Sequence, residues 1–395
     1  STTAVFDVAA VNEGTTELPE NYSVKAAITG QTDLTMTTSL QDGASTTTFA
    51  LTAAVDTASS LTGSITANGV IVADNGTGTT AQAGDSVTGG QGSDDVVNIQ
   101  VSGASTALVT LSAFSTTGVE TIHVSNFDTN VNDAEDHTVD TALMSGVTTM
   151  GLTSSAALGD TQFSNVQNSV AAVMNNGAGD LTLSYASTVF SGLADTQTLA
   201  VSNNSAGTFT ADGAETIAVT SSTVNSSLTN IASNTMATLT VSGDKDLAVT
   251  SALNFAGTGN GTVIDGTLDA STFTGKLTVT ATAETIQATG GTGDDTFNML
   301  ATLTANDVID GGAGTDTITW TGATTASAAA LANISNTEKW TIANDSSFTL
   351  SDAVLANNPG VSLNISGNGT ITTGEDSLGA SLMSTAMSIT ASSAG

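Results

Sequence analysis

Short apolar runs separated by small polar residues recur along almost the whole chain. Runs of 4–6 residues, such as Leu247–Thr250 and Leu277–Thr280, are interrupted at short intervals by Gly, Thr, Ser and Asn. Thr and Val favour the pleated backbone of a sheet, and Gly and Asn mark the turns that bound strands. The pattern predicts many short β-strands. Helical signals are limited to the Ala-rich segment 325–334 and to 351–356, which begins at the N-cap residue Ser351.

Three stretches share the nine-residue pattern G-G-x-G-x-D-x-U-x, in which U is apolar. They begin at Gly89, Gly290 and Gly311. Glycine permits the backbone of a tight turn, and an aspartate together with turn carbonyls supplies the hard oxygen ligands that Ca²⁺ prefers. This nonapeptide is the signature of calcium-holding turns in β-helical repeats. The chain is therefore expected to bind Ca²⁺.

The spacing of these motifs predicts how their turns stack. One coil of a nonapeptide roll holds about 18 residues, with successive turns on opposite sides; the two downstream motifs begin 21 residues apart, one coil plus three. Between them, Asp307 precedes Asp316 by nine residues, just as Asp85 precedes Asp94 upstream. A glycine-poor turn thus feeds a complete turn at both places. The turn at Asp74, about one coil before the upstream motif, is a candidate same-side partner.

We expect one Ca²⁺ between the turns 290–295 and 311–316, with Asp295 and Asp316 as side-chain ligands, and a second near Asp94. The candidate metal-site residues are Gly290, Thr292, Asp294, Asp295, Asp307, Asp310, Gly311, Ala313 and Asp316 downstream, and Asp74, Asp85, Gly89, Gln91 and Asp94 upstream. The alternative is that the motifs keep the turn without the ion. A more degraded copy, 175–180, is expected to hold none.

A second phrase, in which Glu precedes Thr-Ile, recurs without a fixed period. It contains Glu120, Glu215 and Glu284, and a looser copy contains Glu338, at intervals of 95, 69 and 54 residues. Repeats of this kind predict a solenoid whose coils carry insertions of different length. We interpret each glutamate as a solvent-facing residue at the entry to a strand.

The charge balance narrows the class of partner. Thirty-seven Asp and Glu residues stand against four lysines and no arginine, for a formal net charge of −33. Four scattered lysines cannot neutralise a row of phosphates, so we expect no nucleic acid partner. No apolar stretch approaches the length of a membrane span, so no membrane insertion is expected. Because the chain has no cysteine, metal binding and packing must supply the stability that disulfides give elsewhere.

Catalytic motifs are sparse. The two histidines, His123 and His137, lie 14 residues apart without H-E-x-x-H, and there is no G-x-S-x-G elbow, no cysteine and no P-loop. The best remaining constellation is the acidic cluster 133–137, which an acidic surface loop explains more simply than catalysis does. We therefore expect that the protein is not an enzyme.

The segments 268–279, 289–297 and 306–318 resemble RTX-type surface-layer proteins of Gram-negative bacteria. The likeness is most specific over 262–345. It implies an all-β fold, an irregular right-handed parallel β-solenoid with calcium turns and a few short helices. It also implies type I export to the cell surface, where copies of the chain form a two-dimensional, calcium-dependent lattice. Cell-surface polysaccharide is a further candidate partner.

Two alternatives remain open from the sequence. Residues 1–65 lack the nonapeptide and are either a separate N-terminal β segment or the first coils of a solenoid that continues over 66–395. An RTX-type adhesin, or a filament, sheath or virion subunit, would have the same composition as a lattice protein. With only three complete nonapeptides and no recognisable anchor or secretion signal, the chain is also compatible with a processed piece of a larger protein.

Overall fold

The computed structural model describes most of the chain. The described residues are 20–26, 34–40, 46–60, 63–90, 92–130, 137–256, 264–281, 285–299, 303–322, 324–343, 345–366, 370–373 and 388–392. The first two ranges form an antiparallel pair of strands, β1 (Glu20–Ala26) and β2 (Leu34–Leu40).

Thirteen parallel strands form the longest sheet, which we call the long sheet. In spatial order its strands are β3 (Thr47–Ala50), β5 (Ile65–Val72), β7 (Val96–Gly103), β10 (Thr121–Asp128), β13 (Thr149–Ser155), β15 (Ala171–Asn175), β17 (Thr196–Ser202), β19 (Thr216–Ser221), β22 (Thr238–Gly243), β24 (Gly266–Asp269), β26 (Ile286–Thr289), β28 (Val308–Asp310) and β31 (Ile334–Ser335). Spatial order follows chain order, so each strand is one coil after its neighbour.

Four shorter parallel sheets form the other sides of the coils. The four-stranded sheet contains β4 (Thr57–Ser59), β6 (Ser86–Thr88), β9 (Ser115–Thr117) and β12 (Met144–Ser145). The six-stranded sheet contains β8 (Val109–Leu111), β11 (His137–Asp140), β14 (Thr161–Val166), β16 (Leu181–Tyr185), β18 (Thr208–Thr210) and β21 (Asn230–Ala232). The eight-stranded sheet contains β20 (Ser226–Leu228), β23 (Leu247–Ala252), β25 (Leu277–Ala281), β27 (Thr296–Met299), β29 (Thr317–Trp320), β32 (Lys339–Ile342), β34 (Ser362–Ser366) and β36 (Ser388–Ser392). The three-stranded sheet contains β30 (Thr325–Ala326), β33 (Ser347–Leu350) and β35 (Thr370–Thr373).

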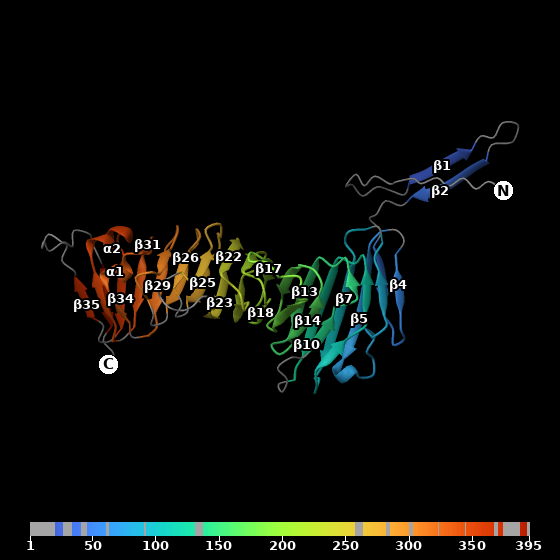
Figure 1. The fold of residues 1–395 in the computed structure, drawn as a ribbon, viewed down its shortest axis with the longest axis horizontal. Coiled ribbons are helices and arrows are strands. Elements are labelled where there is room, and N and C mark those ends of the chain that lie inside the picture. The colour runs from blue at the N-terminus through green and yellow to red at the C-terminus, as the bar shows by residue number, and fades with distance from the viewer. Residues whose placement is uncertain are drawn as a thin grey trace.

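These sheets wind into one elongated parallel β-solenoid (Figure 1). The predicted all-β, parallel solenoid is confirmed. The stack already includes β3 and β4, which pair with β5 and β6 and lie before the boundary expected near residue 65. The two predicted helical segments contain short helices: α1 (Ala328–Leu331) lies within 325–334, and α2 (Asp352–Asn357) begins at Ser351, whose side chain accepts a hydrogen bond from Val354 N–H.

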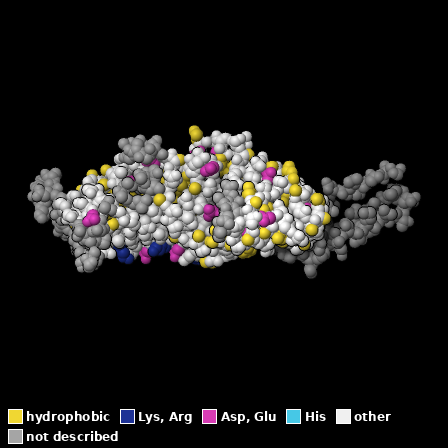
Figure 2. All heavy atoms as spheres, turned by 90° about the horizontal axis from the view of Figure 1, so that it is seen from below, with side chains coloured by type: hydrophobic (Ala, Val, Ile, Leu, Met, Phe, Trp, Pro, Cys, Tyr) yellow, Lys and Arg dark blue, Asp and Glu magenta, His cyan; other side chains and the backbone are white. Residues whose placement is uncertain are grey.

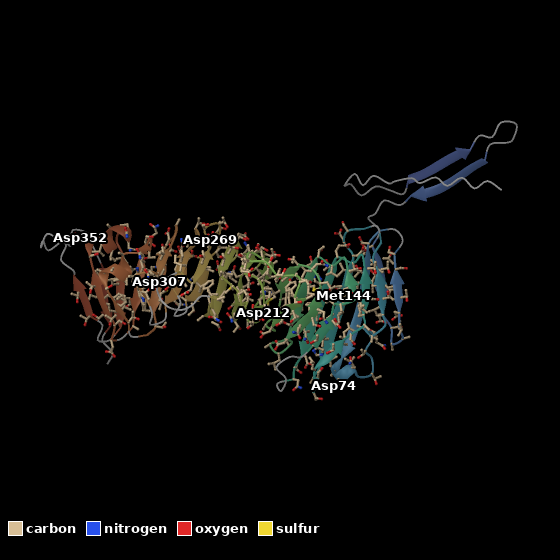
Figure 3. All side chains as sticks on the ribbon, viewed as in Figure 1. Asp74, Met144, Asp212, Asp269, Asp307 and Asp352 are labelled. Carbon is tan, nitrogen blue, oxygen red and sulfur yellow. The ribbon has the colours of Figure 1, made fainter. Side chains whose placement is uncertain are left out.

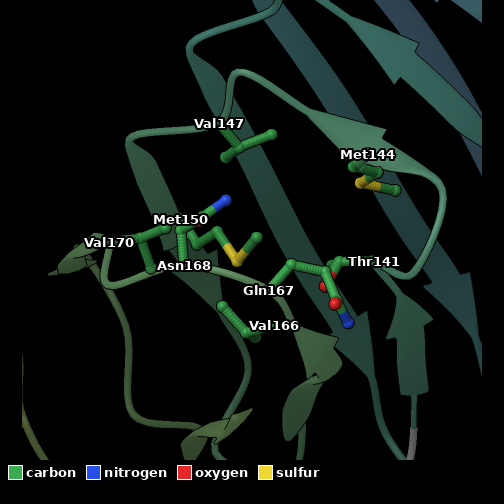
Figure 4. A pocket seen from close by; sticks show the side chains of 8 residues that line it. All are labelled: Thr141, Met144, Val147, Met150, Val166, Gln167, Asn168 and Val170. Atoms are coloured by element: carbon green, nitrogen blue, oxygen red, sulfur yellow. The ribbon is translucent and has the colours of Figure 1, made fainter. Parts of the chain in front are cut away.

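The cross-section of the solenoid narrows along the chain. From β7 to β12, each coil contributes strands to the long, six-stranded and four-stranded sheets in turn, whereas from β24 to β29 each coil alternates between the long and eight-stranded sheets only. The four-stranded sheet ends at β12, and a small crevice lies at this step (Figure 4). It is lined by Thr141, Met144, Val147, Met150, Val166, Gln167, Asn168 and Val170. The two complete downstream nonapeptides therefore lie in the narrow, two-sided part.

Alternation of buried and exposed side chains builds the core. In β7, Val97, Ile99 and Val101 are at most 1% exposed, while Val96 and Asn98 between them are half-buried. Alternate residues of a strand point to opposite faces, so each coil adds one layer of Val, Ile, Leu or Phe to a long, thin core. Each layer is stabilised mainly by the layers directly before and after it.

An aromatic cluster fills the C-terminal coils. The Trp320 ring lies edge-on to Trp340 at 5.5 Å and to Phe348 at 4.9 Å between centroids. Trp340 Nε1 donates to Thr337 Oγ1 at 2.7 Å, and Thr337 Oγ1 donates to Asn358 Oδ1 at 2.6 Å. The cluster is buried, since both tryptophans are at most 1% exposed.

Trp340→Ala should therefore destabilise the protein strongly. Removing a buried tryptophan leaves a cavity and an unpaired Thr337 hydroxyl, and such truncations cost about 3–5 kcal/mol. Urea unfolding followed by far-UV circular dichroism measures the change. Leu193→Ala is the control, because Leu193 is 95% exposed and surface truncations stay within about 0.5 kcal/mol. Equal losses in the two variants would contradict the burial described here.

Candidate metal centre

The two downstream nonapeptide turns lie in successive coils on the same side of the solenoid. Strand β27 pairs with β29 in the eight-stranded sheet, with Thr296 opposite Thr317. Strand β28, which follows Asp307, lies instead in the long sheet. The predicted alternation of sides every nine residues, with one coil between the two motifs, is therefore confirmed.

Carboxylates at the strand entries of this side form a column that joins four coils. Leu277 N–H donates to Asp295 Oδ1 at 2.8 Å, Asp295 N–H donates to Asp316 Oδ1 at 2.7 Å, and Asp316 N–H donates to Glu338 Oε2 at 2.7 Å. We call Asp295, Asp316 and Glu338 the carboxylate column. Both aspartates are fully buried, so each satisfies a backbone donor that water cannot reach.

One oxygen in the column has no partner. Asp295 Oδ2 accepts from Gly291 N–H at 2.7 Å, whereas Asp316 Oδ2 is buried without a hydrogen bond. Asp316 Oδ2 lies against Gly311, where a Cβ atom would be 2.7 Å away and would also collide with the Asn336 carbonyl oxygen. Only glycine fits at Gly311, because the carboxylate and the carbonyl occupy the space of a side chain.

The electrostatic environment of Asp316 disfavours its charge. Burial, followed by the nearby negative charges of Asp295, Glu338 and Asp294, raises the pKa of Asp316 to about 7 from 3.8, although the Asp295 N–H bond opposes this. Burial is also the main cause of the raised pKa of Asp295. A bound cation would stabilise the ionised form of both carboxylates.

The two turns also contact each other directly. Ala313 N–H donates to the Gly291 carbonyl at 2.9 Å, and Thr315 N–H donates to Asp294 Oδ1 at 2.7 Å. Thr292 is exposed and donates its N–H to the coil before it, at the Phe273 carbonyl. The carbonyl oxygens of these turns therefore lie along one seam of the solenoid.

Asp307 and Asp310 lie on the opposite side, with the long sheet. The carboxylate of Asp307 accepts from Ile286 N–H at 2.9 Å and from Thr304 N–H at 2.6 Å. Asp310 Oδ1 accepts from Asn336 Nδ2 at 2.7 Å, and the Asp310 carbonyl accepts from Gly290 N–H at 2.8 Å. The structure thus assigns Asp307 to a cross-coil bond and connects Asp310 to the glycine turns.

In the upstream motif, Asp95 takes the position that Asp316 has downstream. Asp95 is fully buried, accepts from Ile65 N–H at 2.6 Å through Oδ1, and has no partner at Oδ2, which lies against Gly89. Asp94, the residue predicted to bind the ion, is exposed. The turn is one residue longer than the downstream turns, and a fixed motif position therefore points to the wrong aspartate. Gln91 lies outside the described residues.

The other upstream candidates do not join this turn. Asp74 follows the C-terminal end of β5, whereas 89–95 precedes the N-terminal end of the neighbouring parallel strand β7. Its carboxylate accepts from Thr106 N–H at 2.7 Å, and Figure 3 shows it on the outer edge of the N-terminal third, far from Asp307. Asp85 belongs to the four-stranded side, where it accepts from Asp56 N–H at 2.8 Å. The same-side neighbour of the turn is Gly63, whose carbonyl accepts from Gly92 N–H.

The glutamates of the Glu-Thr-Ile phrases are not simply solvent-facing, so that interpretation was wrong. Glu120, Glu215 and Glu338 are half-buried, and each accepts a backbone N–H from an aspartate one coil earlier, at 2.9, 2.8 and 2.7 Å. Glu284 lies outside the described residues. Aligning the phrase with the D-x-U end of the nonapeptide would have revealed this equivalence.

The degraded copy at 175–180 keeps the same kind of bond. Asp180 Oδ1 accepts from Thr208 N–H at 2.6 Å, and Asp180 N–H donates to Asp160 Oδ1 at 2.7 Å. Both oxygens belong to strand entries of the six-stranded sheet. An aspartate in these turns therefore has a cross-coil structural role whether or not an ion binds.

The donor set fits Ca²⁺ at two positions. Among the described residues, no three acidic, histidine or cysteine side chains converge in a way that could hold a metal. A bound ion would therefore combine few carboxylate oxygens with turn carbonyls, as in the nonapeptide. The unpaired oxygens of Asp95 and Asp316, each beside a glycine and a carbonyl, suit that arrangement. Asp295 suits it less, because both its oxygens already accept hydrogen bonds.

A buried Ser-His-Asp contact occurs in the N-terminal third. Ser105 Oγ lies 3.2 Å from His137 Nε2, and His137 Nδ1 lies 3.8 Å from Asp128 Oδ2. Backbone N–H bonds from Asn130 and Ser105 lower the pKa of Asp128, although burial works against them. All three side chains are at most 2% exposed, so no substrate reaches the serine, and the contact joins the loops between coils. The acidic residues 133–136 lie outside the described residues.

No family model, no curated protein and no solved structure matches the chain. Within the described part of the chain, no helix is long and apolar enough to cross a membrane.

The raised pKa of Asp316 predicts a pH dependence in the calcium-free protein. The folded pKa, about 7, exceeds the ordinary value of 3.8, so the native state binds the extra proton between about pH 4 and about pH 7. Stability should therefore fall as pH rises through this range. Asp316→Asn keeps an oxygen for Asp295 N–H but cannot ionise, and should reduce the slope.

Thermal melts in chelator from pH 5 to pH 8 measure this effect. Asp94→Asn is the matched control, because Asp94 is an exposed acid in the upstream turn. If Asp316→Asn and Asp94→Asn leave the same slope as the unmodified chain, Asp316 is ionised without penalty and the expectation is wrong.

Proposed function

We propose that this chain is a structural subunit of an extracellular, calcium-dependent surface layer that assembles from copies of itself on a Gram-negative cell. One observation carries the proposal. At two distant coils of a continuous solenoid, a nonapeptide turn holds a buried aspartate with one unpaired oxygen, at Asp95 and at Asp316. Such oxygens are costly to bury without a partner, and the turns that hold them are of the calcium-binding type.

The architecture favours a scaffold that depends on ions. Each coil contacts mainly its neighbours, so the free energy of unfolding depends on interfaces between adjacent layers. A net charge of −33 on 395 residues opposes compaction by self-repulsion. Ions held between coils would oppose that repulsion where adjacent layers meet. We infer that calcium stabilises the solenoid directly and does no chemistry on a substrate.

The surface is suited to assembly through shared divalent ions. Figure 2 shows acidic side chains scattered singly over one face, with two lysines near one edge. Two such surfaces repel each other, and monovalent salt screens that repulsion without adding attraction. A divalent ion shared between carboxylates does add attraction. An adhesin or filament subunit would use the same solenoid, and the shape of the assembly distinguishes it from a planar layer.

Calcium should raise the thermal stability of the isolated chain. Ligand that binds only the native state stabilises each site by RT ln(1 + [L]/Kd), about 2.7 kcal/mol at a hundredfold excess over Kd. Melts in millimolar Ca²⁺ and in EGTA measure the difference. An identical midpoint in both buffers would exclude structural calcium.

Self-assembly should require calcium in particular. We expect sheets in millimolar Ca²⁺ that dissolve in chelator, while sodium chloride of matched ionic strength does not replace the ion. Light scattering and negative-stain microscopy across the three buffers test this. Isolated fibres in calcium would favour the filament alternative, and chains that remain monomeric at high concentration would exclude a self-assembling layer built by this chain alone.

A further inference from the structure

Two sequence motifs that look unrelated meet in the structure. The nonapeptide 89–97 ends in β7, and the next strand of the long sheet, β10, is preceded by Glu120. The nonapeptide 311–319 ends in β29, and the next strand of the eight-stranded sheet, β32, is preceded by Glu338. In each case, a complete calcium-type turn is followed one coil later by the glutamate of a Glu-Thr-Ile phrase.

The construction is the same at both places. The buried aspartate receives a backbone N–H from the preceding coil at Oδ1, and its own N–H donates to the glutamate Oε2 of the following coil, at 2.9 Å for Asp95 and 2.7 Å for Asp316. Oδ2 is buried without a partner beside the first glycine of the motif. A carbonyl of the following coil, from Gly118 or Asn336, covers that glycine.

Two related positions show that the unpaired oxygen needs both motifs. Asp295 follows a nonapeptide turn, but the next coil offers Asp316 in place of a glutamate, and Asp295 Oδ2 is paired. Asp195 precedes a Glu-Thr-Ile coil and donates to Glu215, but it follows no nonapeptide, and its Oδ2 accepts from Gly192 N–H at 2.8 Å. The other buried, unpaired carboxylate oxygen among the described residues, in Asp352, lies in the first turn of α2.

We propose that the glutamate completes a divalent-cation site with the aspartate of the preceding coil: Asp95 with Glu120, and Asp316 with Glu338. The ligands are Asp Oδ2, the second carboxylate oxygen of the glutamate, and carbonyl oxygens of the turns. Among the described residues no hydrogen bond reaches Glu120 Oε1 or Glu338 Oε1. Two carboxylates and carbonyl oxygens form the hard, anionic set that Ca²⁺ prefers.

This inference rests on the proposed calcium binding and makes it more specific. It places one ion at each end of the repeat region, and it removes Asp295 and Asp94 from the inner ligands. It also gives the glutamate two tasks. One oxygen caps the backbone of the preceding coil in any condition, and the other binds the ion. The ion then ties the two coils together where the carboxylates would otherwise repel each other.

Glu120→Gln and Glu338→Gln separate these two tasks. Glutamine keeps an amide oxygen for the aspartate N–H but removes the charge that the ion needs. We expect the unmodified chain to bind two ions at these sites, and each variant to lose one of them or to bind it about tenfold or more weakly. In EGTA the variants should melt at the midpoint of the unmodified chain. Isothermal titration with CaCl₂ and melts with and without Ca²⁺ give both readouts.

Glu215→Gln is the matched control. Glu215 caps Asp195 N–H in the same way but faces no unpaired carboxylate, so its calcium titration should be unchanged. The proposal is overturned if Glu120→Gln and Glu338→Gln titrate like the unmodified chain, or if they lose as much stability in EGTA as in calcium. It also fails if the unmodified chain binds no calcium, which removes the calcium-dependent function as well. Two bound ions without assembly would remove only the surface-layer function.

Discussion

The hydrogen bond from the backbone N–H of one coil to a carboxylate of an adjacent coil is the interaction on which this solenoid depends. At the strand entries the chain leaves one sheet for the next, and its N–H groups there are buried without a ladder partner of their own. Asp85, Asp95, Asp180, Asp295 and Asp307 each satisfy such a group through one carboxylate oxygen. Because buried donors must be paired, these acids are structural before they are anything else.

That role changes the meaning of the net charge. A chain with −33 charges and four lysines resembles a highly repulsive polyanion, yet part of its acid lies inside the fold, accepting backbone hydrogen bonds. Burial and neighbouring acids raise the pKa of Asp316, so the column formed by Asp295, Asp316 and Glu338 is held under electrostatic strain. A cation between the coils relieves that strain and joins adjacent layers, which are the units of stability in a solenoid.

The change of cross-section sets where such sites can form. In the three-sided part, the turns between strands are spread over three edges, and the upstream nonapeptide is bordered by only one related coil on each side. In the two-sided part, turns recur every 20–21 residues on the same edge, so the carboxylate column extends over successive coils. The aromatic cluster of Trp320, Trp340 and Phe348 then fills the core where the eight-stranded and three-stranded sheets meet.

The sequence by itself determined the parallel solenoid, the alternation of turns every nine residues and the helix start at Ser351, because strand periodicity, glycine turns and N-caps are local properties. It also located the turns that hold Asp295 and Asp316. Only the tertiary structure decided that Asp95 and not Asp94 points inward, that Asp74 lies at the far end of its strand, and that Glu120 and Glu338 meet the aspartate of the coil before. Those facts depend on the register between coils, which insertions of unequal length shift by whole residues, and a one-residue shift turns a side chain from solvent to core.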